Sequence, residues 1–282
     1  MSKERAASQT AMLIASLRAL ACFEEDLAVR GSDTLAEIFL PEDKRQPLHS
    51  PQIRSMIKKA VPEGLYEYVT ARTKFFDELF VNCLDSGFDQ IVLLGAGYDS
   101  RAARFRDKSP GTVIYEVDAP ATQQEKRRIL EESGVSLPGS MVFVPVDFET
   151  DDLFGSLAVA GYDPAARTLF AWEGVTFYLS PRAVDDMLEA IRKNAAPGSL
   201  LGFDFQHIDL EHGLIDTQLQ SEQIKFGLDV AQCAAYLKKF GFSLKEMLDA
   251  KVMADRFLTM SNGGRLGAIN PVMHIALAEL AE

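Results

Sequence analysis

The sequence of 282 residues predicts an α/β fold built on a mostly parallel sheet. Three observations support this prediction. Five short apolar runs alternate with helical segments between residues 88 and 205, residues 1–87 carry helical patterns without a clear strand, and two more strands are expected near the end. The composition, 47% hydrophobic and 25% charged, is that of a globular protein with a substantial core. We therefore expect one domain of residues 88–282 with an added helical cap of residues 1–87.

The first expected element is a helix around residues 11–23. Leu13, Leu17 and Leu20 recur at the spacing of one helix face, and Arg18 interrupts the apolar run. This spacing favours an amphipathic helix over a secretory signal, the alternative that the preceding basic residues suggest. The sequence contains no other candidate membrane span. We expect a soluble, cytoplasmic protein without a membrane partner.

Five apolar runs are expected to form the parallel strands, with crossover helices between them. They are IVLLGAG, TVIYEVD, MVFVPVD, TLFAWEG and SLLGFDF. The helix before the fifth run is marked at both ends: Ser180 suits the N-cap, Pro181 suits the first turn, and Pro197 with Gly198 follows the last turn.

The segment after the fifth strand is expected to form a helix and a closing pair of strands. A helical pattern from Asp229 to Phe240 ends at Gly241, the residue type preferred after a helix. The runs VMADRFLTMS and NPVMHIALAEL, joined by the glycine-rich SNGGRLGAI, are expected to pair antiparallel at the sheet edge. The sheet would then have seven strands, five followed by two.

Charge and cysteine content exclude some classes of partner. The net charge of −12 and a pI near 4.9 oppose binding to nucleic acid or to anionic membrane surfaces, since both require clustered Lys and Arg. Cys22, Cys83 and Cys233 are odd in number and far apart, so we expect reduced thiols and neither a disulfide framework nor a cysteine metal site.

A glycine turn follows the first strand. Gly95, Ala96 and Gly97 stand between an apolar strand and the next helix, where missing side chains let the backbone approach a ligand. The turn departs from the dinucleotide fingerprint GxGxxG because Ser100 replaces the third glycine. The alternative is a plain tight turn in which Asp99 caps the following helix.

Carboxylates stand at the ends of the next strands, where α/β sheets bind ligands. Glu116 and Asp118 share one face of the second strand, and one of them should bind ribose hydroxyls. The alternative for either is to cap the helix that begins near Pro120. Asp147 ends the third strand, and with Phe148 it could hold an adenine by a hydrogen bond and an apolar contact.

A fourth ligand-facing acid, Glu173, ends the fourth strand, whereas Trp172 before it is expected in the core. Arg72 lies within the apolar stripe of a helix. That stripe consists of Leu65, Tyr68, Val69, Phe75, Phe76, Leu79 and Cys83. Because a charge on an apolar face needs a partner, Arg72 should bind either an anionic ligand or an internal Asp or Glu.

In their order and spacing, these segments resemble the leucine carboxyl methyltransferase family over most of the chain. The motifs that carry the resemblance are SQTAMLIASLRAL, ARTKFFD, IVLLGAGYDSRAARF, YEVDAP with Lys126 following, VPVDF and WEGVTFYLSPRAV. The resemblance implies a class I methyltransferase, with a Rossmann-like seven-stranded sheet whose last strand is antiparallel, and with N-terminal helices that cover the cofactor.

The resemblance also implies S-adenosylmethionine as cofactor and assigns residues to it. These residues are Arg72, Gly95, Ala96, Gly97, Asp118, Asp147, Phe148 and Glu173. Arg72 would bind the methionine carboxylate, Glu173 would lie near the amino group, and the glycine turn would line the methionine moiety. Asp118 rather than Glu116 would hold the ribose, with Asp147 and Phe148 at the adenine.

The methyl acceptor implied by the resemblance is a small molecule with a carboxylate or a hydroxyl; methyl esterification of a protein C-terminus is the alternative. A carboxylate needs no catalytic base, whereas a hydroxyl must lose its proton, and His207 or Asp204 are then the nearest candidates. A nicotinamide-dependent oxidoreductase and a non-catalytic cofactor-binding protein are competing hypotheses. His49, His212 and His274 lack metal-ligand spacing, so no metal is expected.

Overall fold

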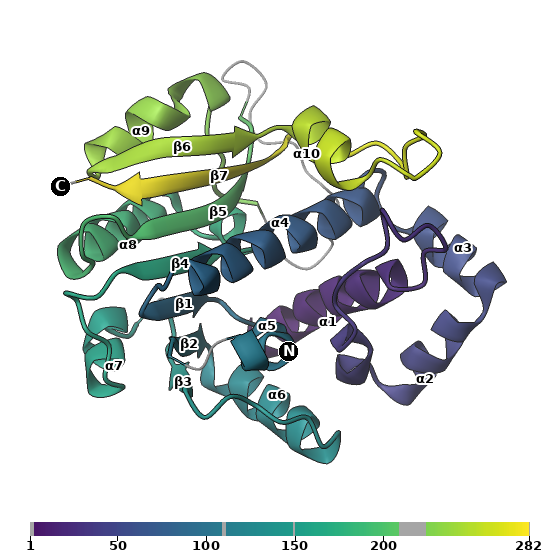
Figure 1. Ribbon diagram of the computed structural model, residues 1–282, viewed down its shortest axis with the longest axis horizontal. Helices are drawn as coiled ribbons and strands as arrows, with labels where there is room; N and C mark the ends of the chain where they lie inside the picture. Colours follow the sequence, from purple (N-terminus) through teal and green to yellow (C-terminus); the bar gives the residue numbers. More distant parts are fainter. Residues whose placement is uncertain (1–2, 109–110, 149, 209–223, 282) are drawn as a thin grey trace.

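A computed structural model describes residues 3–108, 111–148, 150–208 and 224–281, with side chains from residue 10 onward. Its centre is a single sheet of seven strands in the order β3-β2-β1-β4-β5-β7-β6 (Figure 1). The strands are β1 Gln90–Leu94, β2 Val113–Asp118, β3 Met141–Pro145, β4 Thr168–Trp172, β5 Leu200–Gln206, β6 Phe242–Leu248 and β7 Met273–Leu280. The five predicted parallel strands are thus confirmed.

Strand directions bring the carboxyl ends of the parallel strands together. Leu93 of β1 is level with Glu116 of β2 and with Ala171 of β4. Of the seven strands, β7 alone runs against its neighbours, because it pairs antiparallel with both β5 and β6. The prediction of a seven-stranded sheet with an antiparallel last strand is therefore confirmed.

Helices cover both faces of the sheet, as expected for parallel strands with apolar residues on both sides. The α-helices are α1 Lys3–Ala21, α2 Glu42–Arg45, α3 Pro51–Ala60, α4 Leu65–Asp85, α5 Arg101–Arg104, α6 Pro120–Glu132, α7 Leu153–Val159, α8 Pro181–Asn194, α9 Cys233–Lys239 and α10 Ala250–Phe257. Ile91 and Leu93 belong to a core cluster with α1 and α4, whereas Val92 and Leu94 pack with α7, α8 and α9. Alternation along β1 thus divides the core into two layers.

Several predicted helix ends are confirmed by their capping contacts. The Ser180 side chain accepts a hydrogen bond from the Ala183 amide at 3.2 Å, at the start of α8. Gly198 and Gly241 follow α8 and α9 with φ angles of 78° each, the left-handed conformation that glycine adopts most readily. The helical prediction for the N-terminal region is also confirmed, since its described part consists of α-helices, short 3-10 helices and loops.

The prediction of a strand at residues 252–261 is wrong, because this segment begins within helix α10. The Asp249 side chain accepts a hydrogen bond from the Val252 amide at 2.7 Å and so starts the helix. Met253 and Phe257, four residues apart, are its buried face. The true partner of β7 is β6, whose register shifts between Leu244 and Glu246. Such a bulge disrupts the alternation by which strands are identified in a sequence.

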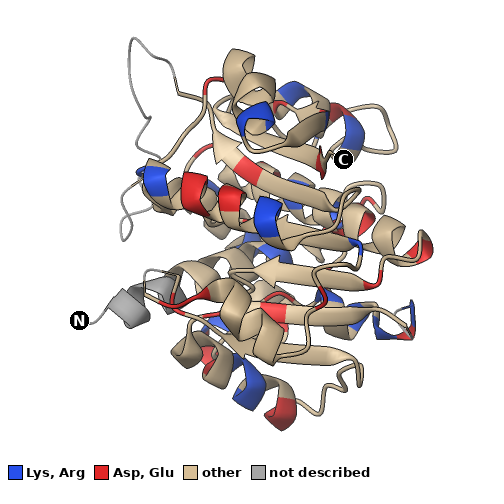
Figure 2. Cartoon of the chain, turned by 90° about the vertical axis from the view of Figure 1, so that its left-hand side faces the viewer, with Lys and Arg blue, Asp and Glu red and all other residues tan. Residues whose placement is uncertain are grey.

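Surface charges of both signs are interspersed. Figure 2 shows acidic and basic residues on the same helices, and on α8 they form pairs such as Arg182 with Asp186 and Arg192 with Glu189. In the described residues no helix combines the length and the apolar character needed to cross a membrane. The thiols of Cys22, Cys83 and Cys233 are free.

Candidate functional site

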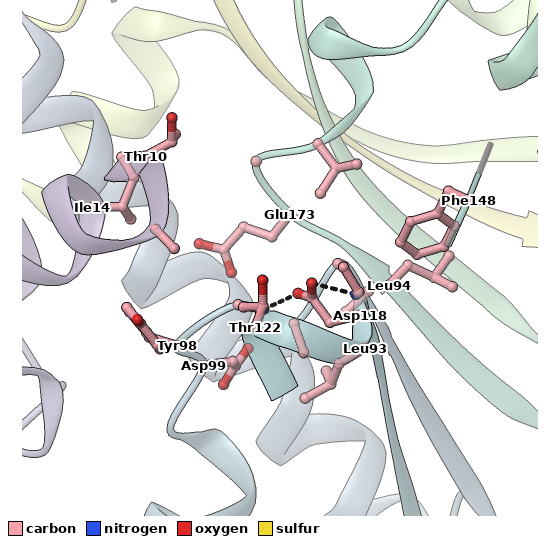
Figure 3. A pocket seen from close by; sticks show the side chains of 18 of the residues that line it. Thr10, Ile14, Leu93, Leu94, Tyr98, Asp99, Asp118, Thr122, Phe148 and Glu173 are labelled. Atoms are coloured by element: carbon pink, nitrogen blue, oxygen red, sulfur yellow. Dashed lines mark hydrogen bonds between the residues drawn. The ribbon is translucent and has the colours of Figure 1, made fainter. Parts of the chain in front are cut away.

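A cavity of about 320 Å³ opens at the carboxyl ends of β1, β2 and β4. Residues of the glycine turn form its floor, and Thr10, Ala11 and Ile14 of α1 contribute from the N-terminal region. Figure 3 shows the carboxylates of Asp118 and Glu173 between Thr10 and Ile14 on one side and Phe148 on the other. The structure places all eight predicted cofactor residues in this lining: Arg72, Gly95, Ala96, Gly97, Asp118, Asp147, Phe148 and Glu173.

The glycine turn has a backbone conformation that residues with a side chain adopt only at a cost in free energy. The Gly95 and Ala96 amides both donate to the Val117 carbonyl, at 2.9 and 3.0 Å, which folds the chain back over β2. Gly95 has a φ of 70°, and a Cβ there would lie 2.5 Å from Cγ2 of Val175. Gly97 has a φ of 46°. Both glycines therefore serve the tight turn that the sequence predicted.

Asp118 connects this turn to the end of β2. Its carboxylate accepts hydrogen bonds from the Gly97 amide and, at 2.6 Å, from the Ala119 amide. Burial raises the pKa of this carboxyl above its ordinary value, although the two amides lower it. Asp118 is half-buried and lines the cavity, so an oxygen-rich ligand group can reach it.

Glu116, the other acid of β2, has a different role. Its carboxylate forms an ion pair with Lys126, and both side chains are 1% exposed. Glu116 does not line the cavity, and the N-cap of α6 is Ala119, without a side-chain capping bond. Neither of the two roles predicted for Glu116, ribose binding or helix capping, describes what the structure contains.

Asp147 and Phe148 lie just beyond β3, at the same edge of the sheet. Asp147 is exposed and Phe148 is half-buried. The amide of Asp147 donates to the Asp151 carboxylate at 2.9 Å, and the Asp151 amide donates to the Asp147 carbonyl at the same distance. These bonds fix the loop that presents an acid and an aromatic ring to the cavity.

Arg72 of α4 lines the cavity and lies between two carboxylates. Its Nε donates to Glu173 Oε1 and its Nη1 donates to Asp204 Oδ2, each at 2.9 Å. Asp204 is further held by the Tyr68 hydroxyl at 2.6 Å and the Gly174 amide at 2.7 Å. Burial alone would lower the pKa of Arg72, but the two carboxylates raise it, so the guanidinium is charged.

The internal ion pair that the sequence left open for Arg72 is therefore present, and it does not use the whole guanidinium. Nε and Nη1 of Arg72 form the two ion pairs, and Nη2 takes part in neither. Because Arg72 also lines the cavity, this nitrogen can donate to an anionic group of a ligand.

A second arginine, Arg101, lines the cavity beside Glu173, and the sequence reasoning missed it. Its Nη1 lies 2.8 Å from Glu173 Oε2 and 2.5 Å from Asp99 Oδ2. Asp99 also accepts from the Arg101 amide at 2.7 Å, although the N-cap of α5 is Ser100 and not Asp99. Burial would raise the pKa of Asp99, but Arg101 lowers it to about 2.

The resemblance implied that N-terminal helices cover the cofactor, but the residues of α1 that line the cavity were not named, although their spacing is visible in the sequence. Thr10, Ile14 and Arg18 recur every four residues and thus share one helix face. Arg18 donates from Nη2 to the Tyr98 carbonyl at 2.7 Å and pairs with Asp33 at 3.0 Å. These contacts attach α1 to the glycine turn.

The candidates for a catalytic base lie outside this lining. His207 accepts a hydrogen bond at Nδ1 from the Val230 amide at 3.4 Å, and Asp204 is buried among its donors. His212 lies outside the described residues. Among the residues that the structure describes, no group of three or more His, Cys, Asp or Glu could hold a metal ion.

Comparisons with known proteins point to one family. The family model described as leucine carboxyl methyltransferase matches residues 11–192. A protein of Mycobacterium avium, provisionally named an S-adenosyl-L-methionine-dependent methyltransferase, is 37% identical over 152 residues, which are 53% of this chain and 49% of the relative. A protein of Mycobacteroides abscessus with the same provisional name is 32% identical over 205 residues, or 70% of this chain and 66% of the relative.

The chain spans about half the length of the first of these curated relatives. Among solved structures, a provisionally assigned methyltransferase from Thermobifida fusca superimposes with a TM-score of 0.57 and 16% identity, over 95% of this chain and 94% of the other. At this identity the likeness concerns the fold alone.

Proposed function

Because the chain belongs to the leucine carboxyl methyltransferase family, we propose that it binds S-adenosylmethionine and transfers the methyl group to a carboxylate or hydroxyl oxygen of a small molecule. One observation carries the proposal: eight residues, predicted from five separate segments of the sequence, line a single cavity. Its place at the carboxyl ends of the parallel strands is where α/β sheets bind nucleotide-type ligands.

The chemistry of the lining fits each part of this cofactor. A carboxylate can be bound by the remaining nitrogen of Arg72, and an ammonium group by the Glu173 carboxylate beside it. Asp118 offers carboxylate oxygens to ribose hydroxyls, and the side-chain-free turn at Gly95 allows close approach. Asp147 and Phe148 offer an acceptor and an apolar face to an adenine ring.

S-adenosylmethionine supplies a methyl group on a cationic sulfur, which an oxygen nucleophile can displace directly. The tasks of the protein are then to align donor and acceptor and to exclude water, and alignment of this kind contributes on the order of 7 to 11 kcal/mol. The Arg72 and Glu173 side chains would orient the amino-acid end, while Thr10 and Ile14 of α1 would shield the cavity from solvent.

An acceptor carboxylate suits this lining without further assistance, because it is ionised at neutral pH and needs no base. A hydroxyl acceptor would require a base near the acceptor oxygen. His207 and Asp204 do not line the cavity, so the geometry favours a carboxylate, or a phenol acidic enough to ionise readily.

A nicotinamide-dependent oxidoreductase is less compatible with the sheet. Dinucleotide-binding sheets of the common 3-2-1-4-5-6 order are parallel, whereas β7 is antiparallel and lies between β5 and β6. Ser100, at the place of the third glycine, is buried and donates a hydrogen bond to Asp33.

Titration calorimetry with S-adenosylmethionine, S-adenosylhomocysteine and NAD tests the cofactor. We expect micromolar binding of the first two and none of NAD; binding of NAD alone would refute the proposal. A screen of small carboxylic acids and phenols, read out as S-adenosylhomocysteine formed, then tests the acceptor. Turnover only with a peptide ending in a free carboxylate would shift the function to protein methylation, and binding without any turnover would indicate a non-catalytic protein.

A further inference from the structure

We propose that Arg101 is a positioning residue, which fixes the amino-acid end of the cofactor site by holding Glu173 without binding the cofactor itself. The proposal rests on the function proposed above. It deepens that function, because it identifies how the chain keeps an acidic side chain in one orientation before a cationic group arrives.

Glu173 is held on both sides. Arg72 Nε lies 2.9 Å from Oε1, and Arg101 Nη1 lies 2.8 Å from Oε2. Two guanidiniums on the two oxygens of one carboxylate fix the rotation of that group, which a single partner would leave free. The orientation of Glu173, which lines the cavity, thus depends on both arginines.

Each of the three nitrogens of the Arg101 guanidinium contacts protein oxygens. Nε donates to Asp77 Oδ1 at 2.8 Å, Nη1 contacts both Asp99 and Glu173, and Nη2 is 3.5 Å from the Thr73 carbonyl. The side chain is 2% exposed. This differs from Arg72, whose Nη2 takes part in neither of its two ion pairs. Arg101 therefore acts through its neighbours.

Those neighbours come from three parts of the chain that form the site. Asp77 and Thr73 lie on α4, the helix that carries Arg72; Asp99 belongs to the turn after β1; and Glu173 follows β4. One buried guanidinium thus connects the helix, the turn and the strand end. Its loss would free an oxygen of Glu173 and remove the ion-pair partner of Asp99, whereas Asp77 would keep Arg104.

Arg104 provides a matched control on the same short helix. It binds Asp77 with two nitrogens, each at 2.7 Å, and lies 3.4 Å from Asp33. It is as buried as Arg18, but it neither lines the cavity nor contacts Glu173. Removal of Arg104 should therefore disturb the same ion network without affecting the orientation of Glu173.

The test compares two ligands that differ only at the amino-acid end. S-adenosylhomocysteine carries an ammonium and a carboxylate, whereas 5′-methylthioadenosine has the same adenosine and thioether without them. For Arg101→Gln we expect about 10- to 100-fold weaker binding of S-adenosylhomocysteine, which corresponds to loss of one charge-assisted hydrogen bond between Glu173 and the ligand ammonium. For methylthioadenosine we expect less than about 3-fold change in affinity. For Arg104→Gln we expect less than about 3-fold change for both ligands.

Arg101→Lys should recover part of the loss, because an ammonium keeps the charge but cannot bridge three carboxylates as a planar guanidinium does. If Arg101→Gln does not fold, the binding of the two ligands is compared in Arg101→Lys instead. Equal weakening of both ligands, or no weakening of either, would overturn the positioning role. Failure of the wild-type protein to bind either ligand would overturn the proposed function, and the inference with it.

Discussion

Replacement of Arg72 by Met should cost this protein a large part of its stability even without a ligand. The substitution removes the charge that compensates Asp204, which is 0% exposed, and one of the two partners of Glu173. Breaking a buried ion pair by removing one partner typically costs about 3 to 5 kcal/mol, because the other charge stays buried. The Asp204 carboxylate would then keep two hydrogen-bond donors, the Tyr68 hydroxyl and the Gly174 backbone amide.

Urea unfolding followed by circular dichroism measures this loss directly. A loss of about 3 to 5 kcal/mol corresponds to a fall in Tm on the order of 5 to 8 °C for a chain of this size. The double variant Arg72→Met/Asp204→Asn should recover about 1 to 3 kcal/mol, since the amide removes the uncompensated charge. Arg182→Met is the control: Arg182 is an exposed arginine of α8, and we expect a change below about 0.5 kcal/mol.

Two results would refute this reasoning. A loss below about 1 kcal/mol for Arg72→Met would mean that water or a local rearrangement compensates Asp204. A double variant no more stable than the single one would mean that the cost comes from lost packing of the arginine stem, not from charge.

Three further predictions concern the turn and the strand ends. Gly95→Ala should destabilise the fold by about 1 to 3 kcal/mol in urea unfolding, because φ is 70° and the new Cβ would meet Val175; Val175→Ala should relieve part of this cost, and no relief would mean that backbone strain dominates. Asp118→Asn should weaken binding of both S-adenosylhomocysteine and methylthioadenosine by about 10-fold or more in calorimetry, whereas exposed Asp186→Asn should not; equal affinities would remove Asp118 from the ribose site. Burial raises the pKa of Glu116 to about 7 from 4.5, against the opposing effect of Lys126. The contribution of the Glu116 carboxyl to the free energy of unfolding is therefore complete below pH 4.5 and declines as pH rises toward 7. Glu116→Gln should flatten this part of the stability profile between about pH 4.5 and 8, and an unchanged slope would show that Glu116 titrates normally.

The sheet could be predicted from sequence largely because its strands are buried on both faces. The run TLFAW is apolar after its first residue, and such runs are bounded by turn residues, so their type is clear. The last pair was harder. Residues 252–261 contain enough apolar residues to suggest a strand, whereas β6 has exposed and half-buried positions and a bulge. A half-exposed strand with a bulge gives a weak local signal.

For the site, the sequence could supply the residues at strand ends and Arg72, a charge in an apolar helix stripe, but it could not supply Arg101, whose role depends on tertiary contacts. The carboxylates after β2, β3 and β4 share one edge because parallel strands end there. Arg101 gives no such signal, since its partners Asp77 and Glu173 are 24 and 72 positions away. The division into a cap of residues 1–87 and a domain of residues 88–282 stays a prediction, and so do the cofactor-binding roles of the lining residues.

The position of β7 in the sheet has a consequence for how the chain can fold during synthesis. β7 follows β6 in sequence yet lies between β6 and β5. During synthesis β6 is therefore made before β7, which in the described part of the chain is its only neighbour in the sheet, and it is unpaired until β7 has been made. Since β6 pairs with β7 alone among the described strands, residues 242–248 can take their place in the sheet only once residues 273–280 are available. Until then, β5 is an open edge to which another chain could add a strand, so aggregation is a hazard of slow translation through this region.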